Sequence, residues 1–261
     1  MTRVAEAGLL RIGCVKYLNA RPLIHGWPGE VVFDHPSVLC EQLAAGALQV
    51  ALVSSFEFLR NPVYTLVDGI SISSNGSVHS VFVAHSGELA EIEEIEVDPA
   101  SQTGINLLRV LLAEMGLAPK FVFRSRLMQR AITPRLAKFF IGDQAIRFRD
   151  ETENTFQFWD LGDEWKKRTG LPFVYALWLI RPEVPSPKAI ADTLRACRDN
   201  NLRELDLLIA AEREFSPDFC QFYLTQCLCY QYGPQEKEGL STFRKLCEKH
   251  GILWHDSRLI I

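Results

Sequence analysis

The sequence predicts an α/β protein with two lobes, followed by a helical C-terminal segment. Short apolar runs alternate with amphipathic helical patterns from about residue 10 to residue 180, and this rhythm starts again near Glu88. After Pro182 only helical patterns remain. Alternating strands and helices are typical of parallel sheets with helices on both faces. Two such sets therefore predict two sheets, each with its own helices.

The first set of elements extends to about residue 84. Apolar runs between turn signals predict these strands: Leu10–Val15, Val31–Phe33, Val50–Val53, Ile70–Ser73 and Val78–Ala84. A helix should begin near Pro22, since proline is tolerated in a first helical turn. Ser37–Ala45 is a second helical segment. Ser54 and Glu57 have the spacing of a capping box, which predicts a short helix after the third strand.

The second set predicts these strands: Ile95–Val97, Phe121–Phe123, Ala137–Ile141 and Pro172–Ile180. Gly104–Met115 and Gly162–Arg168 have helical patterns. The expected C-terminal helices are Pro187–Asn200, Leu202–Arg213, Pro217–Cys229 and Pro234–His250. The long strand near 172–180 can carry the chain back to the first lobe, with the other crossing near 84–88. We expect residues 1–85 with 176–261 to form one lobe, and residues 86–175 the other.

Charge and hydropathy exclude several classes of partner. The 261 residues include 28 Lys and Arg against 32 Asp and Glu, a net charge of -4, which is not the basic footprint of a nucleic-acid-binding protein. No uncharged run approaches the roughly 18 residues of a membrane span, and no signal peptide is evident near the start. We expect a soluble cytoplasmic protein without nucleic-acid or membrane partners. The oligomeric state is left open.

The cysteines and histidines do not predict a metal centre. The seven cysteines include no Cys-x-x-Cys pair and suit core packing in a reducing compartment. The six histidines have no metal-ligand spacing. We expect neither a metal nor another cofactor.

Polar residues at the predicted strand ends mark a candidate ligand site. In this architecture ligands bind at the carboxyl ends of strands, where helix N-termini point. The residues that this rule places on the rim are Asn19, Ser54, Ser55, Ser101, Thr103 and Asp143. Helix capping is the alternative role for these side chains. Ser80 falls within a predicted strand, where a buried hydroxyl needs a partner.

One stretch carries a family resemblance. Arg11–Leu23, with Tyr17-Leu18-Asn19 at its centre, closely resembles the opening of chorismate dehydratases. Further blocks that match in family order are Gly46–Val53, Ser55–Leu59, Val78–Val81, Asp98–Thr103, Ile141–Asp143, Asp160–Trp165, Thr169–Trp178 and Gly239–Phe243. The resemblance spans about residues 10–253. The chain departs from the family pattern at Ser77, His79 and Gln102.

The resemblance implies a fold, an activity and a set of site residues. It implies a type II periplasmic-binding-protein-like fold, with mixed sheets flanked by helices and a helical C-terminal segment. It implies conversion of the dicarboxylate chorismate to 3-[(1-carboxyvinyl)oxy]benzoate and water, on the futalosine route to menaquinone. It implies catalytic roles for Asn19 and Ser80. The substrate-binding residues expected beside them are Ser55, Ser101, Thr103 and Asp143.

Other functions fit the same architecture. A solute-binding protein would bind its ligand without turnover, and the related 1,4-dihydroxy-6-naphthoate synthase has the same fold but a different opening motif. An effector domain of a transcription regulator would need a DNA-binding module before the first strand. The sequence has no Ser-His-Asp pattern, and the resemblance suggests that the substrate's own enolpyruvyl carboxylate removes the proton.

Overall fold

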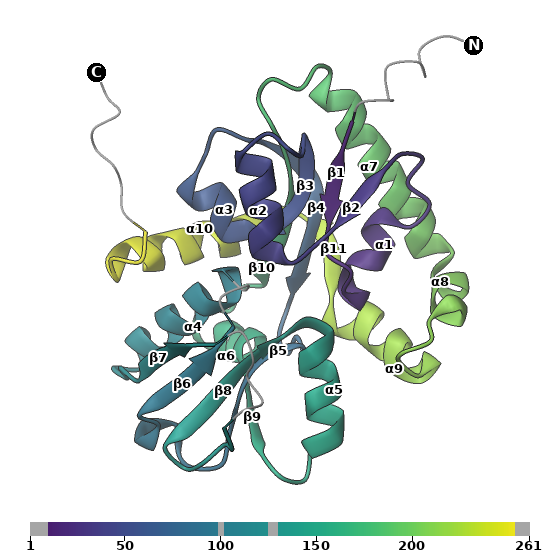
Figure 1. Cartoon of the computed structure of the whole chain (residues 1–261). Helices are drawn as coiled ribbons and strands as arrows, with labels where there is room; N and C mark the ends of the chain where they lie inside the picture. The colour runs from purple at the N-terminus through teal and green to yellow at the C-terminus, as the bar shows by residue number, and fades with distance from the viewer. Residues whose placement is uncertain (1–9, 99–101, 125–129, 254–261) are drawn as a thin grey trace, which may run out of the picture.

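Two β-sheets, each flanked by helices, make up the computed structural model, which describes residues 10–98, 102–124 and 130–253 (Figure 1). The six-stranded sheet has the order β11-β4-β10-β3-β1-β2. Its strands are β1 Ile12–Cys14, β2 Val31–Phe33, β3 Val50–Ser54, β4 Thr65–Ser74, β10 Phe173–Ile180 and β11 Cys229–Tyr232. The five-stranded sheet has the order β7-β6-β8-β5-β9. Its strands are β5 Val81–His85, β6 Glu94–Val97, β7 Lys120–Phe123, β8 Leu136–Ile141 and β9 Gln157–Asp160.

Both sheets are mixed, as the fold class predicted. β1 pairs in parallel with β2 and β3, whereas β10 runs antiparallel between β3 and β4. In the other sheet β6 is parallel to β7 and β8, and β5 is antiparallel to β8 and β9. The α/β architecture with two mixed sheets is therefore confirmed.

Helices cover both sheets and continue into the C-terminal segment (Figure 1). The helices of the first half are α1 Arg21–Ile24, α2 Pro36–Ala44, α3 Ser55–Arg60, α4 Gln102–Glu114, α5 Gly142–Thr152 and α6 Leu161–Thr169. The later helices are α7 Pro187–Arg203, α8 Leu205–Ala211, α9 Pro217–Phe222 and α10 Pro234–Lys249. Within the described part of the chain, no helix is both long and apolar enough to cross a membrane.

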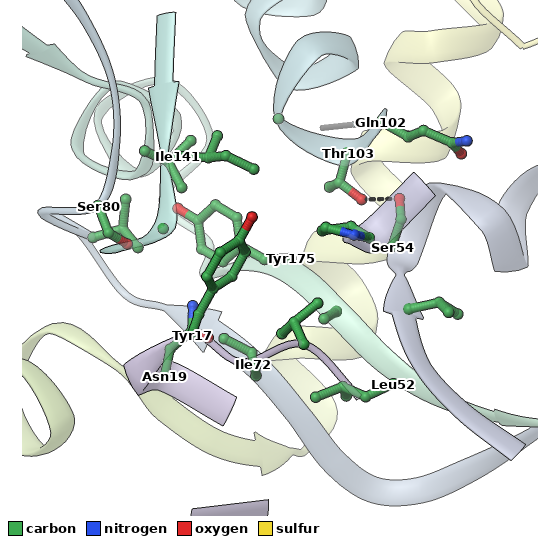
Figure 2. A pocket seen from close by; sticks show the side chains of 18 residues that line it. Tyr17, Asn19, Leu52, Ser54, Ile72, Ser80, Gln102, Thr103, Ile141 and Tyr175 are labelled. Carbon is green, nitrogen blue, oxygen red and sulfur yellow. Dashed lines mark hydrogen bonds between the residues drawn. The ribbon is translucent and has the colours of Figure 1, made fainter. Parts of the chain in front are cut away.

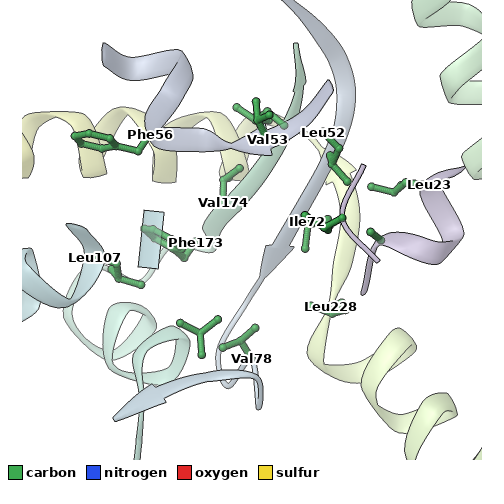
Figure 3. Packing of buried hydrophobic residues seen from close by; sticks show 14 of the residues in the cluster. Leu23, Leu52, Val53, Phe56, Ile72, Val78, Leu107, Phe173, Val174 and Leu228 are labelled. Atoms are coloured by element: carbon green, nitrogen blue, oxygen red, sulfur yellow. The ribbon is translucent and has the colours of Figure 1, made fainter. Parts of the chain in front are cut away.

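The two sheets share one apolar core near the points where the chain passes between them. Buried residues of both lobes form one large cluster (Figure 3), and a smaller cluster around Phe82 and Phe140 belongs to the five-stranded sheet. Where α6, β10 and α10 meet, the rings of Trp165, Phe173 and Phe243 contact one another edge to face, with centroids 5.0 to 6.0 Å apart. The C-terminal helix α10 is thus packed against the return crossing.

The strand pairing places both lobe boundaries at residues that differ from those we expected. β5, Val81–His85, pairs in the five-stranded sheet, and β10 is in the six-stranded sheet from Phe173 onward. The first crossing is therefore residues 75–80, and not 84–88 as expected. The predicted strand Val78–Ala84 starts only at Val81, because His79 has a left-handed backbone with φ 65° that a strand does not accommodate. These limits for the two lobes are a proposal.

Two further local predictions were wrong. Ser54 does not cap α3 with its side chain, because its hydroxyl hydrogen-bonds Thr103 instead. The expected helix Pro217–Cys229 ends as α9 at Phe222 and continues as a π-helical turn, Tyr223–Cys227. The next residues form β11, which hydrophobic periodicity did not reveal since it is a four-residue edge strand.

Gly239→Ala should destabilise the fold. A Cβ at Gly239 would overlap the carbonyl oxygen of Pro172, a backbone atom of the return crossing. Overpacking of this kind costs typically 1–3 kcal/mol, which exceeds the roughly 1 kcal/mol that alanine gains over glycine in a helix. Urea denaturation should show a lower free energy of unfolding. Ser241→Ala, on the exposed side of the same helix, is the control and should change it by less than about 0.5 kcal/mol. Equal stability of both variants would contradict the contact.

Candidate functional site

A cavity of about 90 Å³ lies between the lobes, with walls formed by both sheets and by the start of α4 (Figure 2). Most of the lining is aliphatic, from residues such as Leu52, Ile72 and Ile141. The polar side chains that line it are Tyr17, Asn19, Ser54, Ser80, Gln102, Thr103 and Tyr175. None of the described lining residues is Asp, Glu, Lys, Arg or His. The cavity therefore offers hydroxyl and amide groups and no formal charge.

Asn19 is positioned by a short 3₁₀ turn, Leu18–Ala20, that follows β1. Its Oδ1 is buried and has no hydrogen-bond partner among the described residues. The backbone N–H of Leu18 donates to Oδ1 of Asp143, at 2.9 Å, which ties this turn to α5 in the other lobe. Asn19 is thus not a cap for α1, whose N-cap residue is Ala20, and it lines the cavity.

Ser80 is buried directly before β5 and lines the same cavity. The segment before it is fixed by the carboxylate of Asp160, which accepts hydrogen bonds from the backbone N–H groups of Val78 and His79 and from the hydroxyl of Ser77. The ring of His79 packs against Phe219 and Phe222 of α9, with centroids 5.4 and 5.8 Å away.

Thr103 joins the two lobes at the opposite wall of the cavity. It lies in the first turn of α4, and its hydroxyl hydrogen-bonds Ser54 and accepts from the backbone N–H of Phe56 (Figure 2). Ser55 is fully buried behind this contact, where it donates to the carbonyl oxygen of Val174 at 2.7 Å. The structure therefore brings Thr103 to the cavity wall but does not bring Ser55 there. Ser101 lies outside the described residues.

Asp143 lines a neighbouring cavity of about 330 Å³. Tyr17 and Ile141 line both cavities, and Tyr17 therefore lies between them. The ring of Tyr17 packs so closely on Gly142 that a Cβ there would come within 3.0 Å of it. Burial raises the pKa of Tyr17 to about 12, with smaller contributions from nearby carboxylates. Tyr17 is thus a neutral hydroxyl group at neutral pH.

Sequence reasoning missed several residues of the site. Tyr17 belongs to a matching block, but its side chain was not singled out, and Gln102 was noted only as a departure from the family pattern. Tyr175 is hidden in the apolar run of β10, where it hydrogen-bonds Ser74 at 3.1 Å. Tyr223 donates to Ser80 from more than a hundred residues away, and no pattern in the sequence joins the two. In the described residues no group of three or more His, Cys, Asp or Glu side chains is placed to hold a metal ion.

Comparison with known proteins identifies the family of this chain. The family model for menaquinone biosynthesis matches residues 10–249. The chain belongs to this family. Its curated relatives include the chorismate dehydratase of Thermus thermophilus, which is 30% identical over 253 residues and aligns over 89% of this chain and 93% of the relative. The chorismate dehydratase of Campylobacter jejuni is 24% identical over 234 residues, covering 89% and 91% of the two chains.

Solved structures share the fold of this family member. A protein of Archaeoglobus fulgidus superimposes with a TM-score of 0.71 at 15% identity, over 94% of this chain and 98% of the other. The periplasmic aliphatic sulphonate binding protein of Escherichia coli gives a TM-score of 0.59 at 12% identity, over 94% and 88%. The periplasmic-binding-protein-like fold that the resemblance implied is therefore confirmed.

Asp143→Asn should change the pH dependence of stability. Burial raises the pKa of Asp143 above its ordinary 3.8, so the folded protein holds this proton more tightly than the unfolded chain does. The parent therefore loses stability as pH rises from about 3.8 through the raised pKa. Asparagine keeps the acceptor for Leu18 and does not titrate. The unfolding free energy of the variant should therefore increase relative to that of the parent as pH rises across this window.

Denaturant titrations between about pH 3 and pH 7 measure this difference. Asp192→Asn is a control whose stability relative to the parent should fall, not rise, with increasing pH. Hydrogen bonds from Lys188 and Arg195 lower the pKa of that exposed carboxyl. A difference for Asp143→Asn that stays constant with pH, or shrinks as pH rises, would contradict the burial effect.

Proposed function

We propose that this protein is a chorismate dehydratase, a hydro-lyase that converts chorismate to 3-[(1-carboxyvinyl)oxy]benzoate and water. The observation that carries the proposal is the similarity to two chorismate dehydratases over about nine-tenths of the chain. The product would enter the futalosine route to menaquinone. As a biosynthetic enzyme with a small dicarboxylate substrate, the protein would act in the cytoplasm.

The chemistry of the cavity supports this proposal. The reaction removes a ring hydroxyl and a ring proton, and the ring becomes aromatic, which supplies the driving force. Catalysis then needs a fixed orientation and hydrogen bonds to the oxygens that carry charge. Asn19 and Ser80 are proposed to make such bonds at one wall. At the other wall the first turn of α4, with Thr103, suits a carboxylate because helix N-termini bind anions.

We propose that the enolpyruvyl carboxylate of the substrate is the base. No carboxylate or imidazole is among the described residues that line the cavity. Acids next to lining residues have other contacts: Asp143 accepts from Leu18, and Glu57 is paired with Arg60. Asp98 lines the neighbouring cavity. A substrate carboxylate carried into an uncharged site would meet no competing protein base.

Purified protein should convert chorismate to the carboxyvinyl ether without added metal or nucleotide, and a chelator should leave the rate unchanged. Product is measured by liquid chromatography against an authentic standard. Asn19→Ala and Ser80→Ala should each lower kcat/KM roughly 10- to 150-fold, since a hydrogen bond to a charged group contributes about 1.5–3 kcal/mol.

Ser71→Ala is the matched control. Ser71 is a buried serine of β4 that donates to the carbonyl oxygen of Gln231, away from the cavity. Its replacement should keep activity within about twofold of the parent. Tight binding of chorismate without turnover would favour the solute-binding alternative. Loss of activity with chelator, restored by a divalent cation, would contradict the proposed mechanism.

A further inference from the structure

Tyr223 connects the two residues that carry the proposed function. Its hydroxyl donates a hydrogen bond to Oγ of Ser80 at 2.7 Å, and both side chains are almost completely buried. Asn19 lines the same cavity as Ser80, and its side chain lowers the pKa of the Tyr223 hydroxyl against the larger effect of burial, as a nearby donor does. Three segments far apart in the sequence, around residues 19, 80 and 223, thus meet at one phenolic oxygen.

The number of hydrogens on each group decides which group donates and which accepts. A tyrosine hydroxyl has one hydrogen, and that of Tyr223 is used by Ser80. That hydroxyl therefore has no hydrogen left for Oδ1 of Asn19, which has no partner among the described residues. Ser80 accepts from Tyr223, so its own hydrogen remains available for another acceptor.

We propose that Tyr223 is a positioning residue that sets this direction, so that Ser80 donates its hydroxyl hydrogen to the substrate and Asn19 accepts through Oδ1. This inference rests on the proposed function. It assigns complementary tasks to the two residues. Asn19 orients a substrate hydroxyl, and Ser80 donates to an oxygen that gains negative charge as the reaction proceeds.

The surroundings of Tyr223 hold it in one place. Its ring stacks on Phe219 at 5.6 Å with an interplanar angle of 13°, and Phe219 also contacts His79, the residue before Ser80. Tyr223 begins the π-helical turn that follows α9, a distortion that occurs frequently at functional sites. Burial raises the pKa of the Tyr223 hydroxyl far above its ordinary value, so the group stays a donor at any pH at which the enzyme works.

Tyr223→Phe keeps the ring and removes only the hydroxyl. It should lower kcat about three- to tenfold with little change in KM, because one neutral hydrogen bond that orients Ser80 is lost. Tyr230→Phe is the matched control, since Tyr230 is also buried and its hydroxyl has no hydrogen-bond partner among the described residues. That control should leave kcat within about twofold of the parent.

A double-mutant cycle separates positioning from a general structural effect. If Tyr223 acts through Ser80, adding Tyr223→Phe to Ser80→Ala should change kcat less than about twofold. The same cycle measured by denaturant unfolding should show coupling between the two positions, whatever the ligand is. Equal effects of Tyr223→Phe in both backgrounds, or no coupling in stability, would overturn the inference while leaving the proposed function standing. Absence of chorismate turnover by the parent protein would instead overturn the proposed function, and this role of Tyr223 with it.

Discussion

The buried carboxylate of Asp160 fixes the segment on which the candidate site depends. It accepts hydrogen bonds from the backbone N–H groups of residues 78–79 and from the hydroxyl of Ser77, and it also caps the first turn of α6. One side chain therefore holds both the crossing between the sheets and the helix that leads to the return crossing. His79 keeps a left-handed backbone there, a conformation that is uncommon for a residue with a side chain and costs free energy. The result is that Ser80 enters the cavity wall at the edge of β5.

The second constraint is electrostatic. Bringing a dianion into a mostly aliphatic cavity costs free energy unless its oxygens find donors, and the described lining supplies hydroxyls, amides and the first turn of α4 instead of formal charges. Such neutral donors keep their protonation state over a wide pH range. They also leave the substrate carboxylate without a cationic partner that would lower its basicity. The same arrangement that binds the substrate therefore suits a mechanism in which the substrate supplies the base.

The sequence predicted the α/β class, most strands and the rim residues Asn19 and Thr103, because these depend on local periodicity and on strand ends. It did not predict that β5 starts after Ser80, since the left-handed backbone of His79 is stabilised by Asp160, which is 81 residues away in the chain. The π-helical turn and Tyr223 were missed for a similar reason: an aromatic residue at a helical position is typical of core packing, and only tertiary contact reveals its partner. Ser55 was assigned to the site from its place after a strand, although its side chain points to the carbonyl oxygen of Val174.

The pH dependence of kcat tests whether a protein group of the cavity takes the proton. Of the described lining residues only Tyr17 and Tyr175 can titrate, and burial raises the pKa of Tyr17 to about 12 and that of Tyr175 well above its ordinary value. Outside the cavity wall, burial lowers the pKa of His79 to about 4. We expect kcat for chorismate to be constant from about pH 6 to about pH 9, because a protein base or acid working at neutral pH would give a limb in this range. A limb with an apparent pKa between about 6 and 9, shown by solvent-viscosity controls to reflect the chemical step, would contradict it.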